Sequence, residues 1–401
     1  MNPFPYQRPI LPEQVIDRDL EVQQLLSWCD SAMLVRLDAP RRYGKTSLVR
    51  KVFHEAGKHG TVGVLCDLKG VLTLSDVITR LGRSYAQLRG PLEKMLRPVL
   101  TSIELEFNVS FMGAGAGAKL GARPGNEEAA LFALLDLPQR FAGKGWQAVI
   151  VCFDEFQDVL AVPAADDKLR SAIQHHSDGC AYIFAGSEPR LMNALFSDKR
   201  RAFWNQAEPL ELGPLAPADV AAYVTAQFAA DGRDVGPVLR LVLSTAQGHP
   251  QRTMFLCSKL WERSQPGEPV AIEAWQAALD AAKLQEEHAL DAEWRNLTGS
   301  AQRVLRAVTL NGGRPFQKHA AEAVGVPIGS VDRVSDALVG AYVLRQTGKG
   351  EFAFVDPMLE LYVRDLAGSS LPEADAADVP AASRRRAGVR RPPPPSGATG
   401  R

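Results

Sequence analysis

The segment from Asp38 to Ser47, DAPRRYGKTS, carries the residue types of a phosphate-binding loop. It matches the pattern GxxxxGK[ST] except that Ala39 stands where the first glycine is usual. In such a loop the backbone N–H groups converge on phosphate oxygens at a helix amino terminus, where the helix dipole favours negative charge. Gly44 lets the backbone approach closely, Lys45 reaches the outer phosphates, and Thr46 offers a hydroxyl to Mg²⁺. The other residues expected around the phosphates are Ala39, Pro40, Arg41, Arg42, Tyr43 and Ser47.

Alanine tolerates fewer backbone conformations than glycine, so Ala39 predicts a slightly altered loop entrance and not a loss of binding. A short apolar run precedes the loop and a helical pattern follows it. This context strengthens a motif that is only suggestive as a pattern.

A pair of acids, Asp154 and Glu155, ends the apolar run from Ala148 to Phe153. Ligands of open α/β sheets bind at the carboxyl edge of the strands, so this pair is expected beside the phosphate loop. We expect Asp154 to hold Mg²⁺, directly or through water, and Glu155 to orient and deprotonate an attacking water. In isolation two acids would indicate only a solvated strand end, but the phosphate loop favours the functional interpretation.

A third candidate, Ser187, follows the strand-like run from Ala181 to Ala185. Its hydroxyl can reach the γ-phosphate or the lytic water, and an ordinary turn hydroxyl is an almost equal alternative. Three arginines, Arg190, Arg200 and Arg201, follow closely, and any of them could stabilise charge on a transferred phosphoryl group. The sequence leaves that choice open.

Alternating strand-like and helical segments must position these residues. Strand-like runs cover Met33 to Leu37, Val62 to Leu68, Ala148 to Phe153 and Ala181 to Ala185. Helical spacing covers residues 22–29, where Asp17 is well placed to cap the start, and also 48–53, 77–85 and 129–137. Continuous apolar strands separated by helices predict an α/β fold with a parallel sheet covered on both faces, a three-layer αβα arrangement.

Residues 90–127 interrupt that alternation. Apolar and polar residues alternate from Ser102 to Phe111, and the glycine-rich MGAGAGAKLGARPG follows. We interpret this insert as a two-faced strand or hairpin with a flexible loop. The glycines do not form a dinucleotide fingerprint, which needs a preceding strand and a following helix.

Five segments in a fixed order carry a resemblance to a known family: PRRYGKTSL (40–48), VCFDEFQDV (151–159), FAGSEPRLM (184–192), LELGPLAP (210–217) and AQGHPQRTMFLC (246–257). The chain resembles the archaeal-type ATPase family of P-loop proteins, which is related to the STAND and origin-recognition-like branches of the AAA+ class. The resemblance covers about residues 10 to 366. It implies a P-loop NTPase sheet of order 5-1-4-3-2, a helical lid and a carboxy-terminal winged helix.

The same resemblance implies further site residues. Gly248, His249 and Pro250 match the lid motif of the family, in which the proline packs near the nucleotide base and the histidine can approach phosphate. Val15 to Asp19 resembles the family's hhGRE segment, whose arginine lies near adenine, here Arg18. Asp17 replaces the glycine of that segment. By contrast, His175 and His176 are interpreted as structural.

The expected domains are an ATPase core over 1–213, a helical lid over 214–290 and a winged-helix-like region over 295–366, followed by a disordered basic, Pro-rich tail over 367–401. Within the third region, Thr298 is expected to cap a helix, further helices are expected over 316–324 and 330–339, and a wing hairpin over 344–355. The helix over 330–339 has one base, Arg333, between acids, so protein contact is favoured over DNA binding there.

Composition sets wider limits. The 401 residues contain 46 Lys plus Arg and 46 Asp plus Glu, so the formal net charge is zero and any basic patch must be local. A hydrophobic content of 46% and a charged content of 23% argue against a fibrous or mostly disordered chain. Five scattered cysteines fit reduced thiols and a cytoplasmic protein. No long apolar run indicates export or a membrane span.

These observations together predict a protein that binds ATP with Mg²⁺, hydrolyses it to ADP and phosphate, and uses nucleotide state to change contacts of the lid and winged helix with a protein partner or a second copy. Two alternatives remain open. One is a slow, nucleotide-held signalling scaffold. The other is a DNA-binding ATPase of mobile elements or replication, whose contacts would include Arg333, Arg345 and Lys349.

Overall fold

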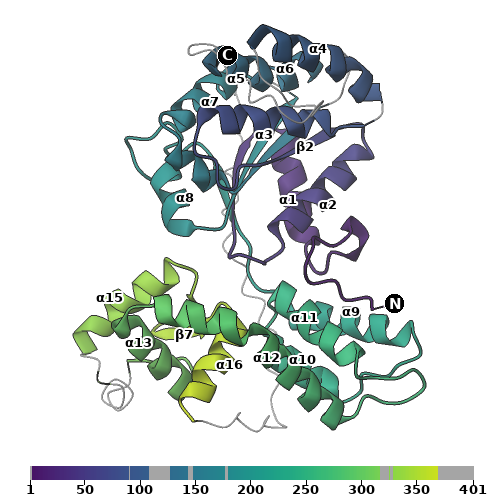
Figure 1. The fold of residues 1–401 in the computed structure, drawn as a ribbon, viewed down its shortest axis with the longest axis vertical. Coiled ribbons are helices and arrows are strands. Elements are labelled where there is room, and N and C mark those ends of the chain that lie inside the picture. Colours follow the sequence, from purple (N-terminus) through teal and green to yellow (C-terminus); the bar gives the residue numbers. More distant parts are fainter. Residues whose placement is uncertain are drawn as a thin grey trace, which may run out of the picture. The chain divides into compact units, whose positions relative to one another are not determined.

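Five parallel strands form the central sheet of the computed structural model, in the order β2-β3-β4-β1-β5. Figure 1 shows this sheet surrounded by helices. The strands are β1 (Leu34–Asp38), β2 (Val62–Asp67), β3 (Val149–Asp154), β4 (Cys180–Gly186) and β5 (Glu208–Glu211). From the opposite edge this order is 5-1-4-3-2, so the predicted sheet order is confirmed. The described residues are 2–89, 91–107, 127–142, 148–176, 179–316, 325 and 328–368.

Helices cover both faces of the sheet. Along β3, Ile150 and Cys152 belong to one hydrophobic core, whereas Val151 and Phe153 belong to another, as the two-residue period of a strand requires. The first core packs under α1 (Asp19–Asp30) and α2 (Lys45–Gly57). The second packs under α3 (Leu74–Ala86), α4 (Pro91–Phe107), α5 (Glu127–Leu135), α6 (Leu137–Ala142), η2 (Phe156–Ala161), α7 (Ala165–Ile173) and α8 (Pro189–Phe196). The predicted αβα fold is therefore confirmed.

The strand expected from residue 102 onward is wrong for its described part, because residues 91–107 form the helix α4. Leu96, Leu100 and Ile103 follow helical spacing and are buried, whereas Leu105, which the alternating pattern would bury with Ile103, is 79% exposed. Burial of the helical stripe against the second core therefore outweighs the local two-residue alternation. The glycine-rich remainder of the insert, residues 108–126, lies outside the described residues, as does the tail over 369–401.

The expected cap on the first helix is also wrong. Helix α1 begins at Asp19 after Arg18, and no side chain caps its first turn. The carboxylate of Asp17 instead accepts a hydrogen bond from the backbone N–H of Ala216 at 2.7 Å. Asp17 has a φ of 44°, in the left-handed region that favours glycine, and it occupies the position where the resembling family has one. Aspartate is one of the non-glycine residues that adopt this region most often, so it is compatible with the turn.

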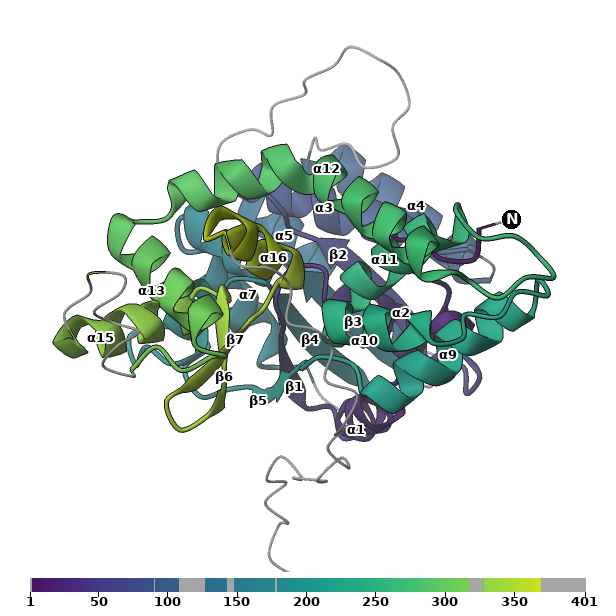
Figure 2. The ribbon, with the colours of Figure 1, turned by 90° about the horizontal axis from the view of Figure 1, so that it is seen from below.

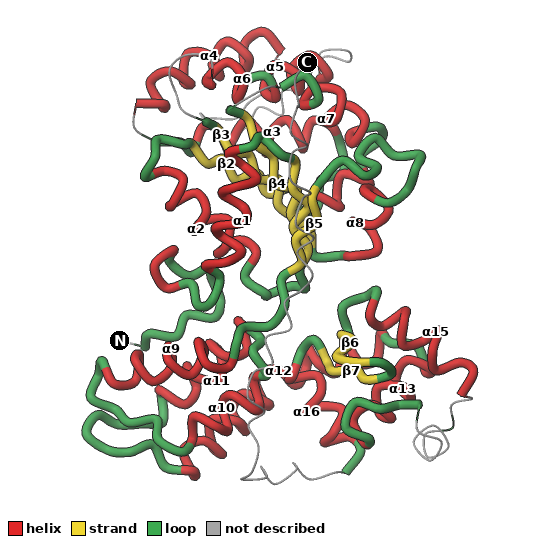
Figure 3. Tube along the Cα trace, turned by 180° about the vertical axis from the view of Figure 1, so that it is seen from behind, coloured by secondary structure: helices red, strands yellow, loops and turns green. Residues whose placement is uncertain are grey.

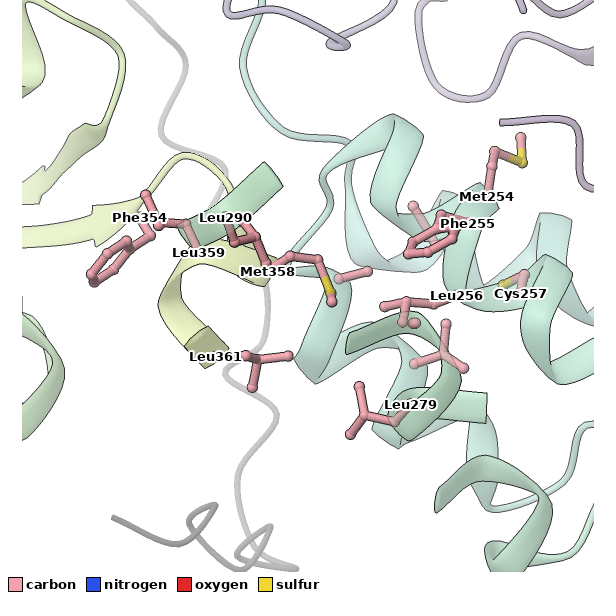
Figure 4. Packing of buried hydrophobic residues seen from close by; sticks show 14 of the residues in the cluster. Met254, Phe255, Leu256, Cys257, Leu279, Leu290, Phe354, Met358, Leu359 and Leu361 are labelled. Carbon is pink, nitrogen blue, oxygen red and sulfur yellow. The ribbon is translucent and has the colours of Figure 1, made fainter. Parts of the chain in front are cut away.

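A third hydrophobic core joins the remaining helices. Its helices are α9 (Pro217–Ala229), α10 (Val238–Ala246), α11 (Pro250–Trp261), α12 (Ile272–Asn296), α13 (Gly299–Leu310), α15 (Ile328–Val339) and α16 (Pro357–Leu366). The long helix α12 contacts both α11 and α16 (Figure 2). Residues of α11, α12 and α16, among them Phe255, Leu279 and Leu359, pack in this core (Figure 4). The helices of the predicted lid and those of the predicted carboxy-terminal region therefore share one core.

The carboxy-terminal elements agree with the sequence in two places. Thr298 accepts a hydrogen bond from the N–H of Ala301 and caps α13 as predicted. The hairpin expected over 344–355 is formed by antiparallel β6 (Leu344–Gly348) and β7 (Glu351–Phe354) (Figure 3). Residues 317–324 of the expected helix lie outside the described part of the chain. All five cysteines are buried free thiols.

Candidate active site

The phosphate loop extends from residue 39, just after β1, to residue 47 in the first turn of α2. Gly44 precedes the helix with a φ of 86°, and a side chain added there would contact nothing within 4 Å, so the backbone conformation is what requires glycine. Ala39 is buried, its N–H donates to the carbonyl of Gly186, and it is not among the residues with positive φ. Alanine is thus compatible with the first position of the loop.

Lys45 occupies the first position of α2, where its buried side chain faces acids. Its ammonium donates a hydrogen bond to the carbonyl oxygen of Ala39 at 3.1 Å. Burial lowers the pKa of Lys45, and the nearby carboxylates of Glu155 and Asp154 oppose that shift. A cation held at the amino terminus of a helix beside a left-handed glycine is the arrangement that binds phosphate groups.

Thr46 and Asp154 lie in direct contact across the loop. The hydroxyl of Thr46 donates to Oδ2 of Asp154 at 2.9 Å. Burial raises the pKa of Asp154, whereas the Thr46 hydrogen bond and the charge of Lys45 oppose that rise. A hydroxyl and a carboxylate are hard oxygen donors, and Mg²⁺ characteristically takes one or two protein ligands while phosphates and waters complete its shell. These two residues therefore fit a magnesium ion.

Glu155 follows Asp154 with a left-handed φ of 51°, between the end of β3 and the start of η2. Its Oε2 accepts hydrogen bonds from the hydroxyl of Ser187 at 2.6 Å and from the amide of Gln157 at 2.7 Å. Burial raises the pKa of Glu155, but these two hydrogen bonds, together with the charges of Lys45 and Arg41, outweigh it and hold the pKa below its ordinary value. The carboxylate is consequently charged at neutral pH, as a base must be.

A cavity of about 540 Å³ opens over the loop, a size within the range of small-molecule sites. Of the predicted site residues, those that line it are Arg18, Arg41, Arg42, Tyr43, Gly44, Lys45, Thr46, Ser47, Glu155 and Pro250. The others, Ala39, Pro40, Asp154, Ser187 and His249, do not line it. Asp154 and Ser187 instead reach it through Thr46 and Glu155, to which they are hydrogen-bonded.

Two residues assigned from the resemblance have structural partners. The guanidinium of Arg18 donates to the carbonyl of Gly213 at 2.6 Å and to Glu21 at 2.8 Å. His249 is 2% exposed, and its Nδ1 accepts the N–H of Arg252, which caps α11. Its ring packs 4.7 Å from that of Tyr43, and burial lowers its pKa to about 4. A neutral, buried, capping imidazole does not face the cavity.

The sequence interpretation missed the amino-terminal segment. Residues 5–10 line one side of the cavity. The segment is anchored at one end by the buried ring of Phe4 and by the amide of Asn2, which donates to the hydroxyl of Ser258 at 2.9 Å. At the other end the N–H of Ile10 donates to the hydroxyl of Ser47 at 3.3 Å. Its prolines were the only local sign of a fixed conformation.

The three candidate arginines lie elsewhere. Arg190 donates to the carbonyl of Ala337, Arg200 pairs with Asp198, and Arg201 pairs with buried Asp166. None of the three lines the cavity. Arg41 does line it and pairs with Glu188 at 2.7 Å.

The parallel sheet of this order, the GKT loop at the start of α2 and the acids that end β3 define the P-loop NTPase fold. Solved structures with related folds include a Walker-type ATPase of Pyrococcus abyssi, with a TM-score of 0.64 at 18% identity over 90% of this chain and 99% of that chain. The ORC2 protein of Aeropyrum pernix, in its ADPNP-ADP complexes, matches with a TM-score of 0.58 at 14% identity over 90% and 96% of the two chains. Its ADP form matches at 0.51 and 13% over the same shares.

At such low identities these similarities concern the fold. No protein-family model matches the sequence, and no curated protein matches it significantly. Among the described helices, none is both long and apolar enough to cross a membrane.

Proposed function

We propose that the protein binds ATP with Mg²⁺ in the cavity over the phosphate loop and hydrolyses it to ADP and phosphate. One observation carries this proposal: Gly44, Lys45 and Thr46 begin a helix that faces Asp154 and Glu155 at the carboxyl edge of the sheet. The helix amino terminus and Lys45 attract the phosphates, while the two acids supply a metal ligand and a base.

Each residue then has a distinct role. Backbone N–H groups of the loop and the ammonium of Lys45 would bind the phosphate oxygens. Thr46 and Asp154 would hold Mg²⁺, which when bound neutralises charge on the phosphates. Glu155 would orient water and accept its proton, with Ser187 donating to the same carboxylate. We place the adenine ring of the nucleotide near Arg18, Pro250 and residues 5–10, which line another part of the same cavity.

We further propose that nucleotide occupancy changes how the lid, residues 214–290, and the winged-helix-like region, residues 295–366, sit against the loop. Two loop residues support this: the hydroxyl of Tyr43 donates to the carbonyl of Val355, and Arg42 lies 3.8 Å from Glu286 of α12. Because the two regions share one core, a displacement of the loop would shift both of them. The consequence is a switch of contacts with a partner.

For the partner, we favour a protein surface or a second copy of this chain over DNA. Helix α15 would be the DNA-facing helix if this region were a DNA-binding winged helix. It carries one basic residue, Arg333, and two acidic ones, Asp332 and Asp336. The molecular mass in solution with and without a non-hydrolysable ATP analogue tests self-association. Duplex binding that weakens on neutralising Arg333 and Arg345 would favour the DNA alternative instead.

The central test is calorimetric titration of ATP and Mg²⁺ into the wild-type protein, Lys45→Ala and the control Lys51→Ala. Lys51 lies on the same helix and pairs with Asp19, so its loss should leave binding unchanged. Loss of the Lys45 ammonium should weaken binding about tenfold to a hundredfold. Phosphate release should fall strongly in Glu155→Gln. If the two lysine variants bind ATP with equal affinity, the proposed phosphate site is wrong. If Glu155→Gln releases phosphate at the wild-type rate, Glu155 is not the general base.

A further inference from the structure

Gln157 is a buried polar residue two positions beyond Glu155, and its side chain makes three hydrogen bonds at the site. Its side chain is 2% exposed, although it touches the cavity wall. Its Nε2 donates to Oε2 of Glu155 at 2.7 Å and to Oδ1 of Asp158 at 3.2 Å. Its Oε1 accepts the backbone N–H of Ser187 at 3.4 Å. Both hydrogen-bonding ends of the amide are therefore used, one toward Glu155 and one toward the end of β4.

The two donors to Glu155 converge on a single oxygen. The hydroxyl of Ser187 and the amide of Gln157 both donate to Oε2, whereas Oε1 accepts no hydrogen bond from the described residues. Glu155 itself lines the cavity. The two hydrogen bonds hold Oε2 in place and leave Oε1 available to a water in the cavity.

Gly186 allows the amide of Gln157 to approach the end of β4. A side chain at Gly186 would come within 2.9 Å of Oε1 of Gln157 and within 2.4 Å of the sulfur of Met192. The glycine, the serine after it and Gln157 thus form a packed unit behind Glu155. Packing of this kind restricts Gln157 to few side-chain rotamers. A hydrogen-bond donor must be held in this way if it is to position a catalytic carboxylate.

Several other charged groups influence Glu155. Lys45 from α2 and Arg41 from the loop favour its ionised form, and Asp154 lies beside it at the end of β3. Asp158 shares the amide of Gln157. Removing the Gln157 donor would leave these charges in place while taking one hydrogen bond from the carboxylate, so a change seen in such a variant can be assigned to that hydrogen bond.

We propose that Gln157 is a positioning residue for ATP hydrolysis: it holds Oε2 of Glu155, jointly with Ser187, so that Oε1 faces the attacking water. This inference rests on the proposed function. When Oε1 takes a proton from water, the resulting hydroxide oxygen bonds to the γ-phosphorus as the bond to the bridging oxygen of ADP breaks. Gln157 gains and loses no proton in this step.

The test uses Gln157→Met, which keeps the approximate shape without donors, and Gln157→Glu, which replaces the donor by an acceptor. Both should lower kcat about tenfold to a hundredfold, because the base is misplaced. Affinity for ADP should stay within about twofold of wild type, equivalent to a few tenths of a kcal/mol. The matched control is Gln276→Ala, an exposed glutamine on α12.

A second measurement separates this inference from ATP hydrolysis itself. Carbon-13 NMR of glutamate-labelled protein follows the Glu155 carboxyl, identified by the signal missing in Glu155→Gln. At pH 7 its chemical shift should change in Gln157→Met, because the carboxylate loses a hydrogen bond, and should not change in Gln276→Ala. An unchanged chemical shift, or full kcat in Gln157→Met, would overturn the role of Gln157. If the wild-type protein binds ATP but releases no phosphate, the hydrolysis proposal fails, while the chemical shift still decides whether Gln157 holds Glu155.

Discussion

The phenol oxygen of Tyr43, in the phosphate loop, donates a hydrogen bond to the carbonyl oxygen of Val355 at 3.1 Å, across 312 residues of sequence. Burial raises the pKa of Tyr43 to about 12, so the phenol remains a donor at neutral pH. Val355 lies between β7 and α16 and is buried in the same core as Tyr43. The loop that would bind phosphate therefore contacts the carboxy-terminal region directly.

Tyr43→Phe tests this contact because it removes the hydroxyl and keeps the ring that packs on His249. Loss of the hydrogen bond should cost about 1 kcal/mol of unfolding free energy in urea. If the contact couples the loop to α16, nucleotide should protect the amides of α16 from hydrogen exchange less in the variant than in wild type. Tyr362→Phe is the control, since its hydroxyl donates to Asp291 instead. Indistinguishable exchange patterns in the two variants would contradict the coupling.

His249 should make stability depend on pH. Burial lowers its folded-state pKa to about 4, below the ordinary value of about 6.5, so the folded protein resists protonation. The contribution of His249 to the free energy of unfolding is complete above pH 6.5 and declines as the pH falls toward 4. Between pH 7 and pH 5 the wild type should lose about 2 kcal/mol from this residue.

His249→Asn should abolish that loss while retaining a side chain that can cap α11. Urea unfolding at pH 5, 6 and 7 measures the difference. His59→Asn, a change at an exposed histidine, should keep the wild-type slope. Parallel pH dependence of wild type and His249→Asn would show that the buried imidazole is not responsible.

A buried guanidinium joins α11 to the start of α16. Arg252 donates to Asp356 at 2.6 Å and to Glu286 at 2.8 Å. Burial raises the pKa of Asp356, but Arg252 outweighs it and holds that pKa below its usual value. Asp356→Asn should cost about 3–5 kcal/mol at neutral pH, because it removes one partner of a buried pair, although asparagine can still accept the N–H of Met358.

The sign of the pH effect follows from the lowered pKa of Asp356. The stabilisation is present above the unfolded-state value of about 3.9 and is lost as the pH falls through the folded-state value. The difference in unfolding free energy between wild type and Asp356→Asn should therefore shrink only in strong acid. Asp365→Asn, which removes an exposed partner of Lys283, should cost at most about 1 kcal/mol. Equal costs for the two variants at neutral pH would contradict the role of burial.

Features determined by neighbouring residues were predictable from the sequence. The GKT tripeptide, the acids after Phe153 and the cap at Thr298 depend on residues a few positions apart, and the structure contains them where they were expected. Helix α4 shows the limit of such patterns. Its residues fit both the two-residue period of a strand and the helical period. Only the position of the second core decides which residues are buried.

Contacts between distant segments were not predictable in this way. Nothing beside Tyr43 indicates Val355, and nothing beside Asn2 indicates Ser258. Gln157 lies within a quoted motif, but its importance depends on the approach of β4, which brings Ser187 to the same carboxylate. Asp17 is a different case. It has the left-handed backbone that glycine favours, at the position where the resembling family has a glycine.

The contact between Thr46 and Asp154 predicts a specific dependence on Mg²⁺. Thr46→Ala removes the hydroxyl that donates to Asp154 at 2.9 Å and should leave Lys45 in place. Half-maximal phosphate release should then require about tenfold more Mg²⁺, as expected when the support of a metal site is removed. Binding of ADP without Mg²⁺ should be unchanged. Thr225→Ala, at an exposed position of α9, is the matched control. If both variants need as much Mg²⁺ as the wild type, Thr46 does not serve the metal, and Asp154→Asn would then show whether the acid does so alone.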